Sequence, residues 1–191
     1  MRPLLAKPPS PGRLLAGTAA NAAVEFALAL PVITLLMLGS VELARYVILN
    51  QKLDRVAVSM ADLVARAETI SQTELDDIFI AAGEVALPFE LGPNGRVIVS
   101  AVTNPDGDGP EIAWQRSNDG AYAATSRLGS EGGAATLGDD LQVREGETAI
   151  VSEVFFDFEP FLSELVLAPR EMYKRAFHRP RLGTLDSIDA G

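Results

Sequence analysis

Glu25 is the residue whose position in this chain most restricts its chemistry. It lies near the N-terminal edge of an apolar run, and no charged residue follows it from Phe26 to Val41. An ionised carboxylate costs about 2.5–3.5 kcal/mol near the centre of a membrane and less near an edge. We therefore expect Glu25 to have a cationic partner, or else to reach the headgroups or to bind a proton there.

Two other groups of residues could do chemistry, and both have a plainer interpretation. Asn104, Asp106 and Asp108 imitate the start of an EF-hand calcium loop, but Gln115 stands where a bidentate glutamate is needed. We favour a hairpin turn there over a weak calcium site. His178 is the only histidine, and no nucleophile, phosphate-loop, dinucleotide or zinc-protease motif accompanies it. We therefore expect no enzymatic activity, no metal and no cofactor.

The apolar run around Glu25 predicts a transmembrane helix over residues 21–46. The stretch Ala22–Leu43 would measure roughly 33 Å as a helix, enough to cross a hydrocarbon core of about 30 Å. A cleaved secretory signal is less favoured, because its apolar region is usually about 7–15 residues long and an A-x-A-like site should follow. The length and the flanking charges also disfavour a buried core helix. The transmembrane residues identified are Val24, Phe26, Leu30, Pro31, Leu35, Leu38 and Val41.

Charge is distributed unevenly on the two sides of this span. The leader, residues 1–20, carries Arg2, Lys7 and Arg13 and no acid, whereas residues 47–191 carry 12 Lys or Arg and 24 Asp or Glu. By the positive-inside rule, this predicts the orientation of a single-pass protein, which we expect in the inner membrane. Its N-terminus would be cytoplasmic and its C-terminal domain periplasmic or otherwise extracytoplasmic.

Composition narrows the possibilities further. The Pro-rich stretch Met1–Ala16 is expected to be disordered, and Pro31 should give the span a mild kink. The acidic domain argues against nucleic acid as a partner, because the phosphates would be repelled. The chain has no cysteine, which excludes disulfides and thiolate chemistry.

The helix is predicted to continue well beyond the span. An apolar stripe at alternating steps of four and three runs to Ile70, and it could pack on the protein's own sheet or on a neighbouring subunit. Ser71 and Glu74 form a capping-box pattern, which predicts a second helix over Gln72–Ala86. The stripe consists of Leu49, Leu53, Val56, Met60, Leu63, Ala67 and Ile70.

The rest of the chain predicts an antiparallel sheet of about four strands. Residues 117–140 are rich in Gly, Ser, Ala and Asp, and are expected to form a long exposed loop. The fold class is therefore α+β: a long N-terminal transmembrane helix that continues into an extracytoplasmic domain, residues 47–191. The predicted strands are Arg96–Thr103, Glu111–Arg116, Glu147–Phe158 and Met172–His178, with a short helical turn over Phe161–Leu167.

Alternation along the third strand places Phe155 and Asp157 on one face and Phe156 and Phe158 on the other. One aromatic face should be buried against the helices, which leaves the other available to a partner. The basic C-terminal residues could meet an acidic partner or an anionic headgroup, although a solvated tail is the simpler interpretation. These residues are Arg170, Lys174, Arg175, Arg179 and Arg181.

The sequence around Glu25 resembles the N-terminal signature of TadE-like proteins, the minor pseudopilins of the tight-adherence (Flp-type) pilus. The stretch Ala22–Pro31 (AAVEFALALP), followed by Gly39–Glu42 (GSVE), carries this resemblance. Near the other end, Val154–Pro160 (VFFDFEP) resembles the aromatic strand of that family, and His178–Arg181 (HRPR) resembles its closing basic motif. A pilin-like α+β domain is the fold that this resemblance implies.

The resemblance also implies a processing site. Such proteins are made as precursors whose basic leader is removed at the cytoplasmic face by a membrane aspartyl prepilin peptidase. Cleavage between Ala20 and Asn21 makes Glu25 the fifth mature residue, the position at which a glutamate matters for assembly. The family usually has Gly before the cut, whereas this chain has Ala20. A cut after Gly17 would make Glu25 the eighth residue.

Processing would supply a partner for Glu25. A new α-amino group, with a reference pKa of about 7.7–8.0, is largely cationic at neutral pH and could pair with Glu25 of an adjacent subunit. Removing one charge of a buried pair typically costs about 3–5 kcal/mol. Pairing of this kind would determine register and the choice of partner.

We therefore favour a structural or assembly component, a minor pseudopilin of a tight-adherence, type IV-like pilus. It would act by helix packing with other pilin-like subunits, with the pilus assembly machinery, the prepilin peptidase and the membrane as further partners. The alternative is an uncleaved, membrane-anchored extracytoplasmic binding module that uses its sheet and long loop. An anchored hydrolase is a distant third.

Overall fold

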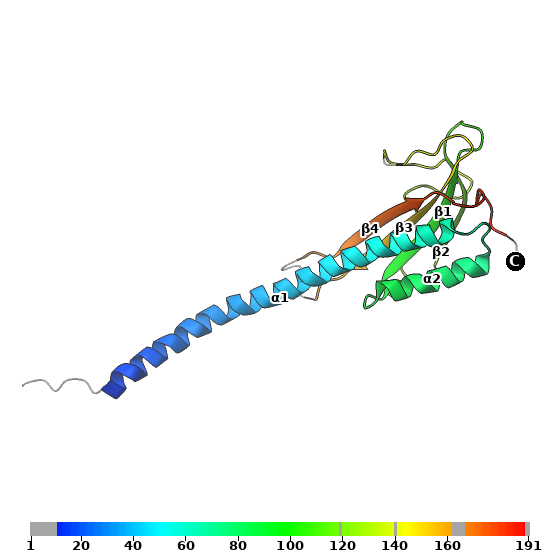
Figure 1. Ribbon diagram of the computed structural model, residues 1–191. Coiled ribbons are helices and arrows are strands. Elements are labelled where there is room, and N and C mark those ends of the chain that lie inside the picture. The colour runs from blue at the N-terminus through cyan, green and yellow to red at the C-terminus, as the bar shows by residue number, and fades with distance from the viewer. Residues whose placement is uncertain (1–10, 119, 140, 162–166, 190–191) are drawn as a thin grey trace, which may run out of the picture.

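A single long helix carries the folded part of this protein at one end. The computed structural model describes residues 11–118, 120–139, 141–161 and 167–189, with side chains from residue 20 onward. Helix α1, Pro11–Ala65, contains 55 residues and is therefore about 80 Å long. Figure 1 shows it as one gently curved rod that extends from the domain and then lies along it. The helix continues through Pro31 without interruption.

Helix α1 begins earlier than the sequence indicated. The expected disordered leader included residues 11–16, but these residues are helical, so that prediction is wrong for them. Pro11 occupies the first position, where a proline's missing N–H removes no intrahelical bond and its fixed φ suits a helix. Residues 1–10 lie outside the described residues.

Helix α1 also ends earlier than predicted, at Ala65 instead of near Ile70. Ser71 caps α2 with an extended backbone (φ −98°, ψ 163°), so the chain has to leave the helical conformation before that residue. The C-terminal tail supplies a partner for the exposed helix end, because the Arg181 N–H donates to the Ala65 carbonyl at 3.0 Å. The end of α1 is therefore determined by contacts on both sides of it.

Helix α2, Gln72–Ala86, has the predicted bounds. Its capping box is formed in both directions: the Ser71 N–H donates to the Glu74 carboxylate at 2.9 Å, and the Glu74 N–H donates to the Ser71 hydroxyl at 3.3 Å. A short helix, α3 (Leu91–Asn94), leads from α2 into the sheet. Figure 1 shows α2 beside the domain end of α1.

The sheet is antiparallel, in the order β2-β1-β3-β4. The fold class predicted from the sequence is therefore confirmed. Each strand begins or ends within two residues of its predicted bound. The predicted turn at Phe161–Leu167 lies mostly outside the described residues. The strands are β1 (Gly95–Thr103), β2 (Glu111–Ser117), β3 (Thr148–Phe158) and β4 (Arg170–His178).

The inner face of the sheet and the two helices enclose the larger core. Leu49, Leu53 and Met60 of the predicted stripe are buried there, together with β-strand residues such as Val99 and Phe156. The stripe therefore packs on the protein's own sheet, as one of the two interpretations proposed. Leu63 departs from it and is 42% exposed, because a helix of 3.6 residues per turn drifts from a strict four-three pattern.

The outer face of the sheet is covered as well, which the sequence did not indicate. Leu128 of the 117–140 segment is fully buried against Val102 and Val151, and Phe155 is only 2% exposed. After Ser117, which ends β2, the segment lacks regular helix or strand in its described residues, as predicted, but it is not simply an exposed loop. The expected free aromatic face is therefore absent at Phe155.

Candidate functional site

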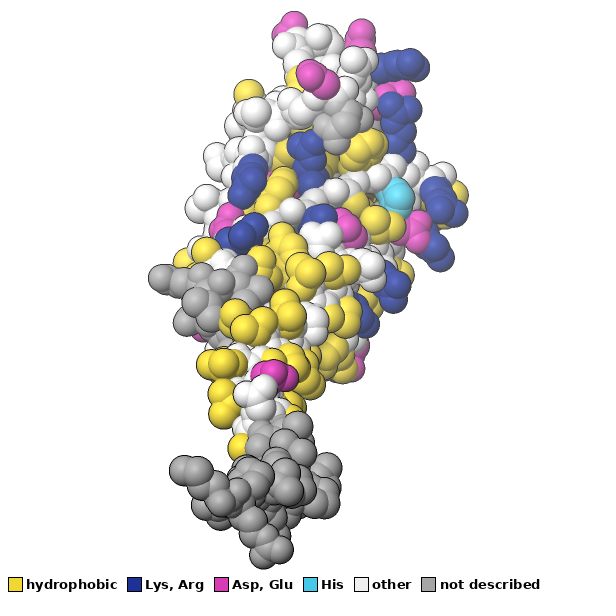
Figure 2. Space-filling view, turned by 90° about the vertical axis from the view of Figure 1, so that its left-hand side faces the viewer, with side chains coloured by type: hydrophobic (Ala, Val, Ile, Leu, Met, Phe, Trp, Pro, Cys, Tyr) yellow, Lys and Arg dark blue, Asp and Glu magenta, His cyan; other side chains and the backbone are white. Residues whose placement is uncertain are grey.

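The exposed part of α1 is the first candidate for function. By length and composition, the helix from Ala20 onward could cross a membrane, and none of its most apolar window is buried. This rules out the buried core helix as an interpretation. Figure 2 shows hydrophobic side chains covering the exposed part of the helix next to the grey residues. The predicted transmembrane residues are all exposed, on the part of α1 that extends away from the domain. They are Val24, Phe26, Leu30, Pro31, Leu35, Leu38 and Val41.

Glu25 is exposed on the same helix, at the N-terminal end of this apolar surface. Its Oε1 accepts a hydrogen bond from the Asn21 Nδ2 at 3.3 Å, one helical turn earlier. The Ala20–Asn21 bond, the suspected processing site, lies within the continuous helix. Asn21 and Glu25 are therefore neighbours in the folded chain, and Glu25 has a neutral donor where the sequence suggested a cationic partner.

Glu42 is a second carboxylate of α1, and sequence reasoning assigned no role to it. Its side chain is only 2% exposed. One oxygen pairs with the Arg45 guanidinium at 3.2 Å, and the other accepts the Phe161 backbone N–H at 2.8 Å. A buried carboxylate is stable only when it has such partners. The signal that could have revealed it is an acid followed three residues later by a base, within a helix that must meet a domain.

Aromatic rings and cations surround Glu42 where α1 joins the domain. The Arg45 guanidinium lies 4.1 Å from the centre of the Phe161 ring, and the Tyr46 ring meets the Phe158 ring edge-on at 5.3 Å. Arg170 of β4 lies 5.6 Å from the Tyr46 ring. We call these residues, together with Glu42, the junction. They attach one end of the sheet to the point at which α1 leaves the domain.

A groove of about 250 Å³ lies beside the junction. Arg45 and Leu49 of α1 line one side, and the remaining lining comes from the α2–β1 connection and the end of β3. Its charged lining is mixed, since Glu90, Asp157 and Glu159 face it along with Arg45. Among the described residues that line the groove, no two groups are arranged as nucleophile and base.

Glu153, in the middle of β3, holds the long loop onto the outer face of the sheet. It is fully buried and accepts hydrogen bonds from the Ser126 hydroxyl, from the Arg127 N–H at 3.0 Å and from the Tyr173 hydroxyl at 2.8 Å. Burial and the bond to Glu153 raise the pKa of Tyr173. Both oxygens of the Glu153 carboxylate therefore bind the loop, one through Ser126 and the other through Arg127.

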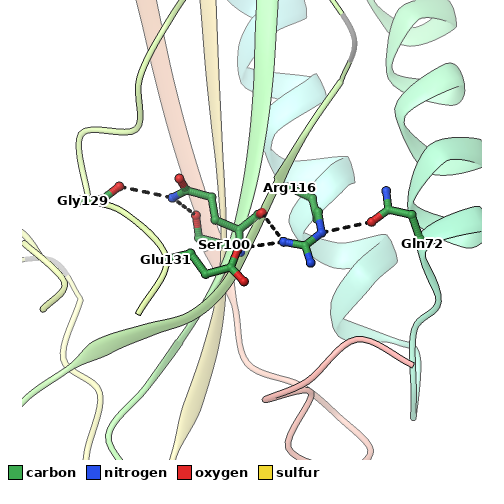
Figure 3. Close-up of polar contacts among 6 residues, drawn as sticks. Gln72, Ser100, Arg116, Gly129 and Glu131 are labelled. Atoms are coloured by element: carbon green, nitrogen blue, oxygen red, sulfur yellow. Dashed lines mark hydrogen bonds and ion pairs between the residues drawn. The ribbon is translucent and has the colours of Figure 1, made fainter. Parts of the chain in front are cut away.

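The same loop is attached at two further points. The Tyr122 hydroxyl donates to Glu171 at 2.7 Å, and this bond raises the pKa of Tyr122 to about 12. At the edge strand β2, Arg116 lies between Gln72 of α2 and Glu131 of the loop, as Figure 3 shows, at 3.0 Å and 2.7 Å. These contacts join helix, strand and loop into one body.

The other residues considered for chemistry have structural roles. The Asn104 amide donates to the Val143 carbonyl at 3.1 Å and accepts from the Gly109 N–H at 3.3 Å, which stabilises the β1–β2 turn. Asp106 and Asp108 are exposed, and no group of His, Asp or Glu in the described chain is arranged to hold a metal ion. The calcium interpretation gains no support from this geometry.

His178 and the basic residues near the C-terminus show no catalytic arrangement among the described residues. The hollow beside His178 is lined by Asp139, Arg144 and Arg179 among others, but by no serine or threonine of the described chain. Three of the basic residues pair with acids of the domain, although the side chains of Arg179 and Arg181 stay more than half exposed. Lys174 pairs with Asp54 at 3.2 Å, Arg179 with Glu147 at 3.2 Å and Arg181 with Asp62 at 3.1 Å.

One comparison with known proteins gave a match. Residues 21–61 match the family model described as TadE-like protein. The matched segment begins at Asn21, includes Glu25 and Glu42, and ends within α1 before the sheet begins. Over these residues the resemblance inferred from the sequence is confirmed. No curated protein and no solved structure matches the chain.

Proposed function

We propose, from the TadE-like segment at residues 21–61, that this protein works with a tight-adherence pilus as a structural or assembly component. TadE-like proteins are a pilus-associated family and not a family of enzymes. The observation that carries the proposal is the position of the match. It covers the exposed apolar helix and the start of the core stripe, the parts of α1 that could meet a membrane and other helices.

The finer role that we propose is that of a minor pseudopilin. Its α1 surface would pack against other pilin-like subunits, as the small residues among the apolar ones permit. The membrane anchor supports this role, because the same surface can be buried either by lipid or by neighbouring helices. The orientation proposed is the one expected from the charge asymmetry, with the N-terminus in the cytoplasm.

Processing at Ala20–Asn21 is part of the same proposal. Because this bond lies within α1, a prepilin peptidase would need the helix to open locally before cleavage. The new Asn21 amine would then offer a cationic partner to Glu25 of an adjacent subunit, whereas the neutral Asn21 amide bonds Glu25 within one chain. The test is coexpression with an active peptidase, followed by N-terminal sequencing of the protein recovered from membranes.

The expected result is a mature chain that begins at Asn21, with cleavage improved in Ala20→Gly and blocked in Ala20→Phe. A start at Thr18 would move the site to Gly17. An intact chain, with a known prepilin cut in the same cells, would contradict processing and favour an uncleaved membrane-anchored binding module.

Glu25→Gln tests the assembly role separately from processing. We expect this variant to insert into membranes and to be cleaved, but to lose co-isolation with pilin-like subunits, because the neutral amide cannot pair with an amine. Glu84→Gln, an exposed carboxylate of α2, is the matched control. Normal co-isolation of Glu25→Gln would show that the pairing role is wrong while leaving the processing result unaffected.

A further inference from the structure

Phe161 is held at a fixed height along α1. Its backbone N–H donates to the buried Glu42 carboxylate at 2.8 Å, and its ring lies 4.1 Å from the Arg45 guanidinium. Both contacts are to α1, although Phe161 follows the last residue of β3 by only three positions. The ring is therefore attached to the long helix at the point where the helix leaves the domain.

The height of Phe161 corresponds to one edge of a membrane. Glu25 and Arg45, which bracket the apolar stretch, are separated by about 30 Å of helix, and this equals the thickness of a hydrocarbon core. If Glu25 lies at one boundary, Arg45 lies at the other. A ring in contact with Arg45 then lies at the boundary on the domain's side.

The exposure of Phe161 is unusual for its position in the domain. Its side chain is 81% exposed, more than Leu28 at 73% on the apolar helix itself. The aromatic residues that precede it on β3, Phe155, Phe156 and Phe158, are buried. An aromatic ring exposed to water loses the stabilisation that burial would give it, so this position favours an apolar environment outside the domain.

The chemistry around the ring is that of a membrane–water interface. Each of its two exposed or half-buried rings has a cationic neighbour. The Arg45 guanidinium lies 4.1 Å from the Phe161 ring, and the Arg170 guanidinium lies 5.6 Å from the Tyr46 ring. Aromatic rings with a polar edge or a cationic neighbour are enriched where headgroups meet acyl chains. The apolar surface of α1 also continues up to this point, with Leu43 53% exposed and Val47 45% exposed.

We propose that Phe161 inserts into the lipid interface on the domain's side of the membrane and anchors the domain to the bilayer. With α1 and Phe161 both in the bilayer, the domain has two attachments instead of one, so its rotation and tilt relative to the membrane are restricted. The inference requires only that α1 spans a membrane, and it does not depend on the pilus role or on processing.

The test places an indole at this site in the full-length chain. Phe161→Trp is reconstituted in phosphatidylcholine vesicles whose acyl chains carry bromine either near the headgroup or near the chain end. The natural Trp114 is buried, with its indole N–H bound to the Leu185 carbonyl at 2.8 Å, so it supplies a constant background. We expect a blue-shifted emission from the new indole that is quenched most by the shallow bromines and little by aqueous iodide.

Leu182→Trp is the matched control. Leu182 is 55% exposed, and the Arg181 N–H beside it donates to the carbonyl of Ala65, the last residue of α1 and the end farthest from the apolar stretch. An indole there should be quenched by iodide and not by bromine. Near-UV circular dichroism of Trp114 checks that both variants keep the fold.

Quenching of the new indole of Phe161→Trp by iodide, without quenching by either bromolipid, would overturn the proposal. So would protection of this indole from both quenchers, because that result would mean that protein, and not lipid, covers the ring.

Discussion

The carboxylate of Glu42 accepts the backbone N–H of Phe161 at 2.8 Å, although 119 positions separate the two residues along the chain. Through this bond, and the pairing of Glu42 with Arg45, the end of β3 is attached to α1 just where α1 leaves the domain. The exposed apolar helix and the folded domain are therefore one mechanical unit, in which a force on either part is transmitted to the other.

Removal of the Glu42 carboxylate should loosen this junction. In Glu42→Ala, the Arg45 guanidinium and the Phe161 N–H lose a charged partner, which should lower the free energy of unfolding by about 2 kcal/mol. Glu42→Gln retains an acceptor oxygen and should lose less. Thermal unfolding of the detergent-solubilised protein measures both, with the exposed Asp77→Ala as control. Equal stability of Glu42→Ala and wild type would contradict a structural role for the junction.

The Glu153 carboxylate should determine whether the 117–140 segment stays on the sheet. Glu153→Ala leaves three buried donors without their acceptor, and we expect the free energy of unfolding to fall by about 3 kcal/mol. Tyr173→Phe removes only one donor and should cost about 1 kcal/mol. Limited proteolysis is the direct measurement, since cleavage between residues 117 and 140 should become faster in the order wild type, Tyr173→Phe, Glu153→Ala. Unchanged cleavage in Glu153→Ala would show that other contacts hold the loop.

A matched pair of substitutions on α1 separates packing inside the chain from packing between chains. Leu53 is fully buried and Leu63 is 42% exposed, so Leu53→Ala should cost about 2–5 kcal/mol and Leu63→Ala much less. Chemical unfolding of the monomer in detergent gives both values. If Leu63→Ala instead weakens association with other subunits, Leu63 belongs to an intermolecular surface. Similar losses of monomer stability at both sites would contradict the burial described.

The capping box of α2 should make stability depend on pH. The bond from the Ser71 N–H, and then that from the Ser71 hydroxyl, lowers the pKa of Glu74 below its ordinary value of 4.5. A depressed pKa contributes stability that is complete above 4.5 and is lost as the pH falls through the lower folded value. Wild type should therefore be more stable than Glu74→Gln at neutral pH, and the difference should disappear in acid.

The measurement is a series of thermal unfolding curves for wild type and Glu74→Gln between neutral and acidic pH. Glu84→Gln, at the opposite end of α2, controls for the loss of one surface charge. A difference between wild type and Glu74→Gln that stays constant down to strong acid would show that the Glu74 charge does not contribute.

Elements whose signals are local were predicted well. The Ser71–Glu74 box gave the start of α2, because a cap and its first turn depend on residues only three positions apart. The β-branched run at Thr148–Phe158 gave β3 for a similar reason. The end of α1 was missed, because it depends on Arg181 and on the capping of the next helix.

The candidate functional residues also divide into those with a local sequence signal and those that only the tertiary structure reveals. Glu25 could be selected as a candidate from the sequence, because a lone carboxylate at the edge of an apolar run is costly wherever the chain folds. The burial of Glu42 and Glu153 could not be predicted, although the spacing of Glu42 and Arg45 is a local signal, since distant segments bury both carboxylates. The burial of Phe155 was likewise invisible, because alternation along a strand gives the face of a side chain but not what covers that face.

The sequence by itself determined the apolar helix, the capped helix after it, the antiparallel strands and the position of Glu25. Each of these follows from periodicity, capping or hydrophobic length within a short window of residues. Only the tertiary structure decided that the long loop closes the outer face, that Glu42 joins helix to domain, and that Phe161 lies beside Arg45. The physical reason is that burial and pairing are properties of segments brought together from distant parts of the chain.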